Sequence, residues 1–175
     1  MGCDFAEDTV RRLKGKEKID IVIVNGENSA DGNGITKRSM EQIFSFADVI
    51  TTGNHCFRRK EFTEYYDIKE NLLRPANYPD GVAGHGVCVL DMGAYSFAVV
   101  NLMGTAFMEP LNNPFECIDR LLEDIHTPNI LVDFHAEATS EKKAMGFYLA
   151  GKVSAVIGTH THVQTADRSE ERRVG

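Results

Sequence analysis

The sequence lacks paired cysteines and long apolar runs. Its four cysteines lie far apart and form no CxxC pair, which disfavours a zinc ribbon or a disulfide framework and favours reduced thiols. No apolar stretch approaches the roughly 20 residues that span a bilayer. The first 16 residues contain no apolar core of a secretory signal. We therefore expect a cytoplasmic protein with no membrane partner.

Basic charge is also scarce. There are 19 Lys and Arg residues against 26 Asp and Glu residues, a formal net charge of −7, which disfavours an extended nucleic-acid surface. A small phosphate ester stays open as a partner, because bound metal ions would dominate the field of an acidic pocket. The length of 175 residues suits one domain. We predict that domain over residues 1–167, with a charged tail at 168–175, and leave the oligomeric state open, a homo-oligomer included.

Helical and strand patterns alternate along the chain. We expect strands at 19–24, 49–52, 129–134 and 153–157, a hairpin within 86–101, and helices at 5–16, 36–46, 58–70, 114–125 and 140–149. The strands are nearly continuous in Val, Ile and Leu, a composition typical of burial on both faces. The pattern predicts an α/β fold in which one β-sheet core is flanked by helices.

Polar side chains follow each of the four buried strands. They are Glu27 and Asn28, then Asn54 and His55, then His135, and finally His160 and His162. Ligands of open α/β sheets bind beyond the carboxyl ends of the strands, so we expect these groups to meet at one edge. Each motif alone is weak, since NGEN and GNH stretches are usually turns and a lone histidine is often structural. Their occurrence at one edge favours a functional site.

The residue types indicate a metal centre. Carboxylate, amide oxygen and imidazole suit Mn, Fe or Zn, and the absence of cysteine disfavours a structural zinc site. His160 and His162 are two residues apart, so on an extended segment they point to the same side. A carboxylate such as Glu27 can bridge two ions, and paired metals clamp the attacking and leaving oxygens of a phosphoryl displacement.

Three further residues each have two interpretations. Asp133 either orients a ligand or ends a strand. Arg74 either binds phosphate or is an ordinary surface arginine. His85 is a loop residue that could touch substrate only if that loop moves.

The ordered motifs VNGENSADGNGIT, TTGNH, LLRPANYP, VVNLMG, LVDFHAEATSEK and VIGTHTHVQTAD resemble the YmdB-type family of calcineurin-like bacterial metallophosphoesterases, from about residue 19 to Asp167. The resemblance implies a phosphodiesterase acting on small phosphodiesters such as 2′,3′-cyclic nucleotides. It implies two metal ions, with iron favoured over manganese or zinc.

The resemblance also implies a role for each site residue. Glu27 would bridge the two metals, and Asn28 and His162 would serve the first. Asn54, His135 and His160 would complete the second, and His55 would protonate the leaving oxygen. A metal-bridging hydroxide would attack phosphorus.

Two departures from the family pattern lead us to expect a fragment. The family begins with a strand ending in Gly-Asp, whose aspartate binds the first metal, whereas this chain starts at Met1-Gly2-Cys3-Asp4, which we place beyond that strand. The tail at 168–175 does not resemble the family. We expect an incomplete calcineurin-like fold, a first metal site weaker than the second, and weak or absent activity of this chain by itself.

Two other functions compete with the phosphodiesterase interpretation. An amidohydrolase also uses an HxH pair, but places it on an early strand of a barrel, whereas His160 and His162 lie late in this chain. A non-catalytic module that binds metal or nucleotide and signals through a partner would keep the ligands without turnover.

Overall fold

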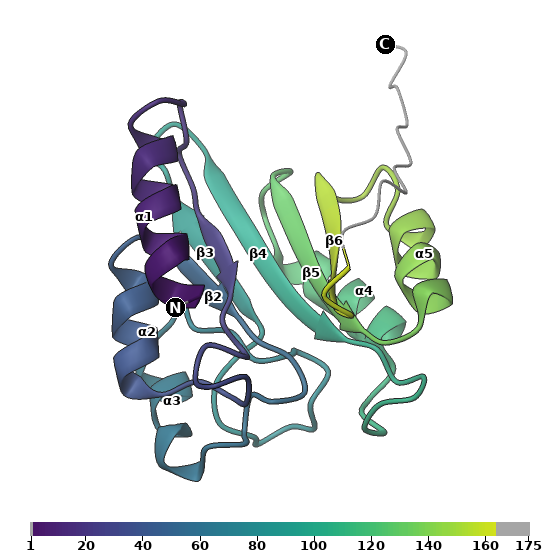
Figure 1. Cartoon of the computed structure of the whole chain (residues 1–175). Coiled ribbons are helices and arrows are strands. Elements are labelled where there is room, and N and C mark those ends of the chain that lie inside the picture. The colour runs from purple at the N-terminus through teal and green to yellow at the C-terminus, as the bar shows by residue number, and fades with distance from the viewer. Residues whose placement is uncertain (1, 164–175) are drawn as a thin grey trace.

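Two β-sheets stack face to face between two groups of helices (Figure 1). The computed structural model describes residues 2–163. The first sheet pairs β1 (Ile23–Asn25) with β2 (Val49–Thr51) in parallel. The second has the order β3 (Val87–Asp91), β4 (Ser96–Met103), β5 (Ile130–Ala136), β6 (Ala155–His160). Its β3–β4 pair is antiparallel and its other two pairs are parallel. The α/β class is confirmed, but the single sheet that we predicted is wrong.

The stacking follows from the pattern of burial along the strands. Alternate residues of β4 face different clusters: Val100 packs toward the helices, whereas Val99 joins Val49 of β2 in a core between the sheets. Because both faces are apolar, each sheet can pack on a helix layer outside and on the other sheet inside.

The helices cover the two outer faces. The helices α1 (Gly2–Lys14), α2 (Lys37–Phe44) and α3 (Tyr65–Ile68) lie on the side of β1 and β2, and α4 (Pro114–Asp124) and α5 (Thr139–Tyr148) lie against β4 to β6 (Figure 1). The predicted N-cap of α2 is confirmed, because the Thr36 hydroxyl accepts a hydrogen bond from the Ser39 amide in a capping box. None of the described helices has the length and apolar character needed to cross a bilayer.

The helix expected at 58–70 is wrong. That segment forms a short 3-10 helix, η1 (Lys60–Phe62), and the single turn of α3. Phe62 and Tyr66 are both buried, with ring centroids 5.6 Å apart, and the Tyr66 hydroxyl donates to the Cys56 carbonyl. Burial of these rings from a broken segment outweighs its helical propensity.

Two strands extend into the predicted site motifs. β5 continues through His135, and β6 is displaced from 153–157 to end at His160. The ends of β1 and β2 reach the other sheet through Asp133, which accepts hydrogen bonds from Asn25 and Thr51. The carboxyl ends of these four strands therefore meet at one edge. The predicted tail at 168–175 lies outside the described residues.

Candidate metal centre

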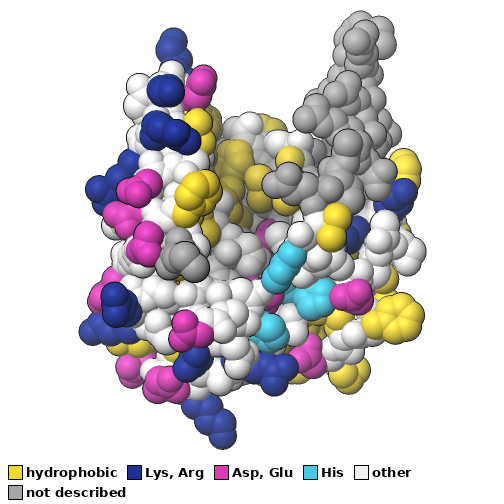
Figure 2. All heavy atoms as spheres, viewed as in Figure 1, with side chains coloured by type: hydrophobic (Ala, Val, Ile, Leu, Met, Phe, Trp, Pro, Cys, Tyr) yellow, Lys and Arg dark blue, Asp and Glu magenta, His cyan; other side chains and the backbone are white. Residues whose placement is uncertain are grey.

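The His135 side chain lies at the centre of a group of facing donor atoms. Its Nε2 is 3.0 Å from Asn54 Oδ1, 3.0 Å from His160 Nδ1 and 3.3 Å from Glu27 Oε1. Ligand atoms of Glu27, His135 and His160 all lie within 4.8 Å of one another. Figure 2 shows histidine side chains gathered on one face beside acidic groups.

Hydrogen bonds behind the two rings determine which nitrogens carry protons. The Thr159 hydroxyl donates to Asp133 Oδ1 at 2.6 Å, so its oxygen is left to accept from His135 Nδ1 at 3.0 Å. The Glu137 carboxylate lies 2.9 Å from His160 Nε2 and accepts a hydrogen bond from the N–H at that nitrogen. These partners fix the tautomers, as they do for histidines that bind metals.

The inner atoms are consequently all lone-pair donors. His135 Nε2 faces His160 Nδ1, Asn54 Oδ1 and, when the carboxyl is ionised, Glu27 Oε1 with no hydrogen between them. Such a set is repulsive unless a cation lies among it, and nitrogen and oxygen ligands of this kind suit Mn, Fe or Zn. The residues present therefore fit a metal ion.

The electrostatics of the pocket agree with this fit. Burial raises the pKa of Glu27 to about 7, and burial together with the nearby His160 lowers the pKa of His135 to about 3. Both shifts arise because the protein alone offers these buried groups little compensating charge. A bound cation would lower both pKa values: it would reverse the shift of Glu27, add to that of His135, and so favour carboxylate and neutral imidazole.

Gly53 permits the close approach of the β2 loop to His135. A Cβ on Gly53 would lie 2.3 Å from His135 Nε2, far inside van der Waals contact. Only glycine lets Asn54, the next residue, reach the imidazole. Close contact with His135 thus explains the glycine at the first position of the GNH motif.

A second group of side chains also contacts Glu27. Asn28 Nδ2 is 3.2 Å from Glu27 Oε1 and 3.3 Å from His162 Nε2, while Asn28 Oδ1 is 2.9 Å from His55 Nδ1. The backbone amide of His55 donates to the second oxygen of Glu27 at 3.3 Å. The Glu27 carboxylate therefore contacts both groups, and all seven predicted residues lie in one contiguous set.

The prediction that His160 and His162 point to the same side of an extended segment is wrong. Both residues have a left-handed backbone, with φ of 95° and 54°. His160 contacts His135 and His162 contacts Asn28. Positive φ turns the chain between them, so the two rings reach different groups.

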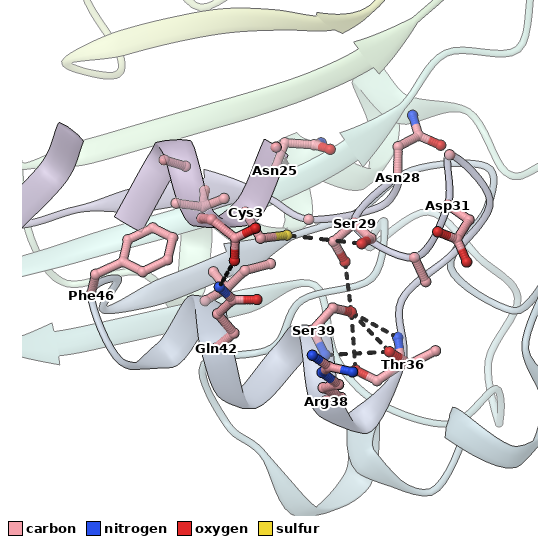
Figure 3. Close-up of a pocket in the computed structure, with 18 of the residues that line it drawn as sticks. Cys3, Asn25, Asn28, Ser29, Asp31, Thr36, Arg38, Ser39, Gln42 and Phe46 are labelled. Atoms are coloured by element: carbon pink, nitrogen blue, oxygen red, sulfur yellow. Dashed lines mark hydrogen bonds between the residues drawn. The ribbon is translucent and has the colours of Figure 1, made fainter. Parts of the chain in front are cut away.

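The loop that carries Glu27 and Asn28 is fixed to α2. Its Ser29 hydroxyl donates to Ser39 at 2.9 Å, and the Ser29 carbonyl accepts from Cys3 of α1 (Figure 3). The loop, α1 and α2 line a cavity of about 770 Å³ beside Asn28. On its wall Asp4 accepts a hydrogen bond from Gln42.

The three open alternatives have structural outcomes. Asp133 is buried and reaches His135 through Thr159, which favours the orienting role. Arg74 is neither a surface residue nor a phosphate ligand here, because it is 8% exposed and donates to backbone carbonyls, including those of Pro75 and Ala83. The His85 ring contacts the Glu70 carbonyl rather than the group around His135.

Sequence reasoning missed Thr159, Glu137 and Glu109. Thr159 precedes His160 and Glu137 follows His135 by two residues, so their spacing from the ligands was the available signal. Glu109 acts on the site through its charge, which raises the pKa values of Glu27 and His55 as one of several smaller contributions. Its position in a loop after β4 gave no periodic signal.

Solved structures with this fold extend beyond the present chain. A hypothetical protein from Thermus thermophilus is 41% identical, with a TM-score of 0.91 over 97% of this chain and 67% of that one. A structure described as a novel phosphatase from Mycoplasma pneumoniae is 34% identical, with a TM-score of 0.89 over 95% of this chain and 62% of that one.

Sequence comparison points in the same direction. The 2′,3′-cyclic-nucleotide 2′-phosphodiesterase of Bacillus subtilis (strain 168) is 47% identical over 169 residues, which cover 95% of this chain and 64% of that protein. The chain thus spans somewhat less than two thirds of that relative's length. The family model described as YmdB-like protein matches residues 1–170. The chain belongs to the YmdB-like protein family.

Proposed function

We propose that this chain carries the metal centre of a phosphodiesterase that hydrolyses small phosphodiesters such as 2′,3′-cyclic nucleotides. The observation that carries the proposal is the set of facing lone pairs from Glu27, Asn54, His135 and His160. The substrate class is supported by the name of the Bacillus subtilis relative. The free thiols of Cys3, Cys56, Cys88 and Cys117 support a cytoplasmic location.

Two metal ions fit the two groups that meet at Glu27. The first would be held by Glu27, Asn28 and His162, and the second by Glu27, Asn54, His135 and His160. Asn28 would serve as a ligand after its amide turns, because its nitrogen now faces Glu27 and His162. Iron is our first assignment, with manganese or zinc as alternatives. When bound, such ions act as Lewis acids on phosphoryl oxygens and on an attacking water.

His55 is the general acid in this proposal. Its Nδ1 lies 2.9 Å from the Asn28 side chain, so the imidazole is beside the residues proposed to hold the first metal, within reach of a leaving oxygen bound there. Burial, followed by the charge of Arg58, lowers the pKa of His55. The protonated ring is therefore a stronger acid than free imidazole and gives its proton to the leaving oxygen more readily.

Because we expect weak or absent activity of the chain by itself, the test uses the chain completed with a strand ending in Gly-Asp and a family-like C-terminus. Three variants of this manganese-loaded protein are compared on 2′,3′-cyclic AMP and on an aryl phosphodiester whose leaving group needs no proton. Glu27→Gln should lose both bound metal and turnover. His55→Ala should keep its metal but lose about 10²–10⁴-fold in turnover of the cyclic nucleotide and much less with the aryl ester. His85→Ala, outside the metal ligands, is the control. A completed wild type without metal-dependent turnover, or Glu27→Gln with normal turnover, would overturn the proposal.

A further inference from the structure

The loop after β4 carries an aromatic side chain to the mouth of the metal centre. Phe107 lines a cavity of about 410 Å³ together with Asn54, Met108, Glu109 and His160. Two of these, Asn54 and His160, are among the facing donors of the metal centre. A ligand held there by its phosphate would extend over Phe107.

Phe107 is the most exposed of the large apolar side chains in the described part of the chain, at 91%. Its backbone is left-handed, with φ of 63°, a conformation that bulky residues rarely adopt. Burial of the ring does not explain this conformation, because the ring is in solvent. The backbone instead holds an aromatic face out beside the cavity.

Contacts with α5 hold the loop in this position. Glu141 accepts hydrogen bonds from the backbone amides of Thr105 at 3.0 Å and Ala106 at 3.1 Å. Gly104 leaves room for that carboxylate, since a Cβ there would lie 2.5 Å from Glu141 Oε2. The residues immediately before Phe107 are thus fixed by two bonds to a charged group, which are stronger than neutral ones.

The other side of the loop is joined to the metal ligands. The Glu137 amide contacts Met108 Sδ at 3.3 Å, and the Glu137 carboxylate lies 2.9 Å from His160 Nε2. Phe107 therefore has a defined place relative to the histidines. The Glu109 carboxylate, also on this wall, disfavours a second anionic group in the cavity.

We propose that Phe107 is a stacking platform for the base of a nucleoside monophosphate ester, and that Glu141 is the positioning residue that holds it. This rests on the proposed function and assigns the residue that would recognise the base of its nucleotide substrates. Every base has a π face, so stacking selects for a base without choosing among the four.

Measured binding affinities test the stacking role of Phe107 independently of turnover. Opening a 2′,3′-cyclic nucleotide at its 2′ ester leaves a 3′-monophosphate, so the probes are adenosine 3′-monophosphate and base-free ribose 3-phosphate. Each is titrated calorimetrically into the manganese-loaded chain. Wild type should bind the nucleotide about 5- to 30-fold more tightly, within the range of one aromatic stack.

Phe107→Ala should bring the nucleotide's affinity down to that of ribose 3-phosphate, and Phe107→Trp should restore the difference. Glu141→Gln should reduce the difference and leave the affinity for ribose 3-phosphate unchanged. Phe147→Ala, at another exposed phenylalanine, is the matched control. Circular dichroism verifies that each variant is folded.

Two results would overturn the stacking role alone: equal affinity of wild type for both probes, or a preference for the nucleotide that survives in folded Phe107→Ala. If metal-dependent turnover is present in either case, the proposed function stands. If neither probe binds and the completed protein shows no turnover, the proposed function and the stacking role both fall.

Discussion

Thr159→Val isolates the hydrogen bonds that join the buried Asp133 to His135, one of the proposed metal ligands. Valine keeps the shape of threonine but removes the oxygen that donates to Asp133 at 2.6 Å and faces His135 Nδ1 at 3.0 Å. The aspartate keeps its bonds from Thr51 and Asn25, so it loses one charge-assisted bond of three. The imidazole N–H loses its acceptor.

The expected magnitudes follow from these two losses. A hydrogen bond to a charged group contributes about 1.5–3 kcal/mol, and Thr159 is partly exposed, so water offsets part of the loss. We expect the free energy of unfolding of the metal-free chain to fall by about 2–3 kcal/mol. Because the ring is no longer held in one tautomer and orientation, manganese affinity should fall by about 10- to 100-fold.

Urea unfolding in chelator measures the first quantity, and calorimetric titration with Mn²⁺ measures the second. The matched control is Thr51→Val, which removes another hydrogen bond to Asp133 without a contact to His135. It should lower stability similarly and leave manganese affinity close to that of wild type. If both variants, or neither, lose manganese affinity, Thr159 does not orient the ligand.

Two other predictions concern packing and thiol chemistry. Gly53→Ala should abolish manganese binding in titrations, because its Cβ would lie 2.3 Å from His135 Nε2, whereas Gly146→Ala, with nothing within 4 Å, should bind normally and gain up to about 1 kcal/mol in urea unfolding. Burial raises the pKa of Cys56 to about 12, so almost no thiolate exists at about pH 8, and a thiol reagent should modify the partly exposed Cys3 well before Cys56. Rapid modification of Cys56 in folded protein, or normal metal binding by Gly53→Ala, would contradict these two predictions.

The sequence predicted those features of the fold and the site that depend on local residue pattern and on the chemistry of the same residues. The pattern of apolar strands, each followed directly by polar residues, predicted the α/β class. It also predicted that Glu27, Asn54, His135 and His160 meet at one edge of the strands. Thr36 signalled the start of α2 through its capping chemistry. These features depend on residues close together in the chain.

Features that depend on long-range packing were not predictable in this way. The stacking of two sheets depends on which face each apolar residue takes, as with Val99 and Val100, and continuous apolar strands conceal that choice. The breakage of the 58–70 helix depends on where Phe62 and Tyr66 are buried. The turn between His160 and His162 depends on a left-handed backbone conformation at both residues. L-amino acids rarely adopt that conformation, so an extended segment was the natural expectation.

The central claim is that Glu27, Asn54, His135 and His160 hold a metal ion. Crystals of the chain grown with Mn²⁺ and measured near the manganese absorption edge would locate the ion by anomalous scattering. We expect a peak within coordinating distance of all four side chains, and loss of that peak in His135→Ala. A wild-type map with no peak among these residues at saturating Mn²⁺, or with its peak elsewhere, would contradict this claim.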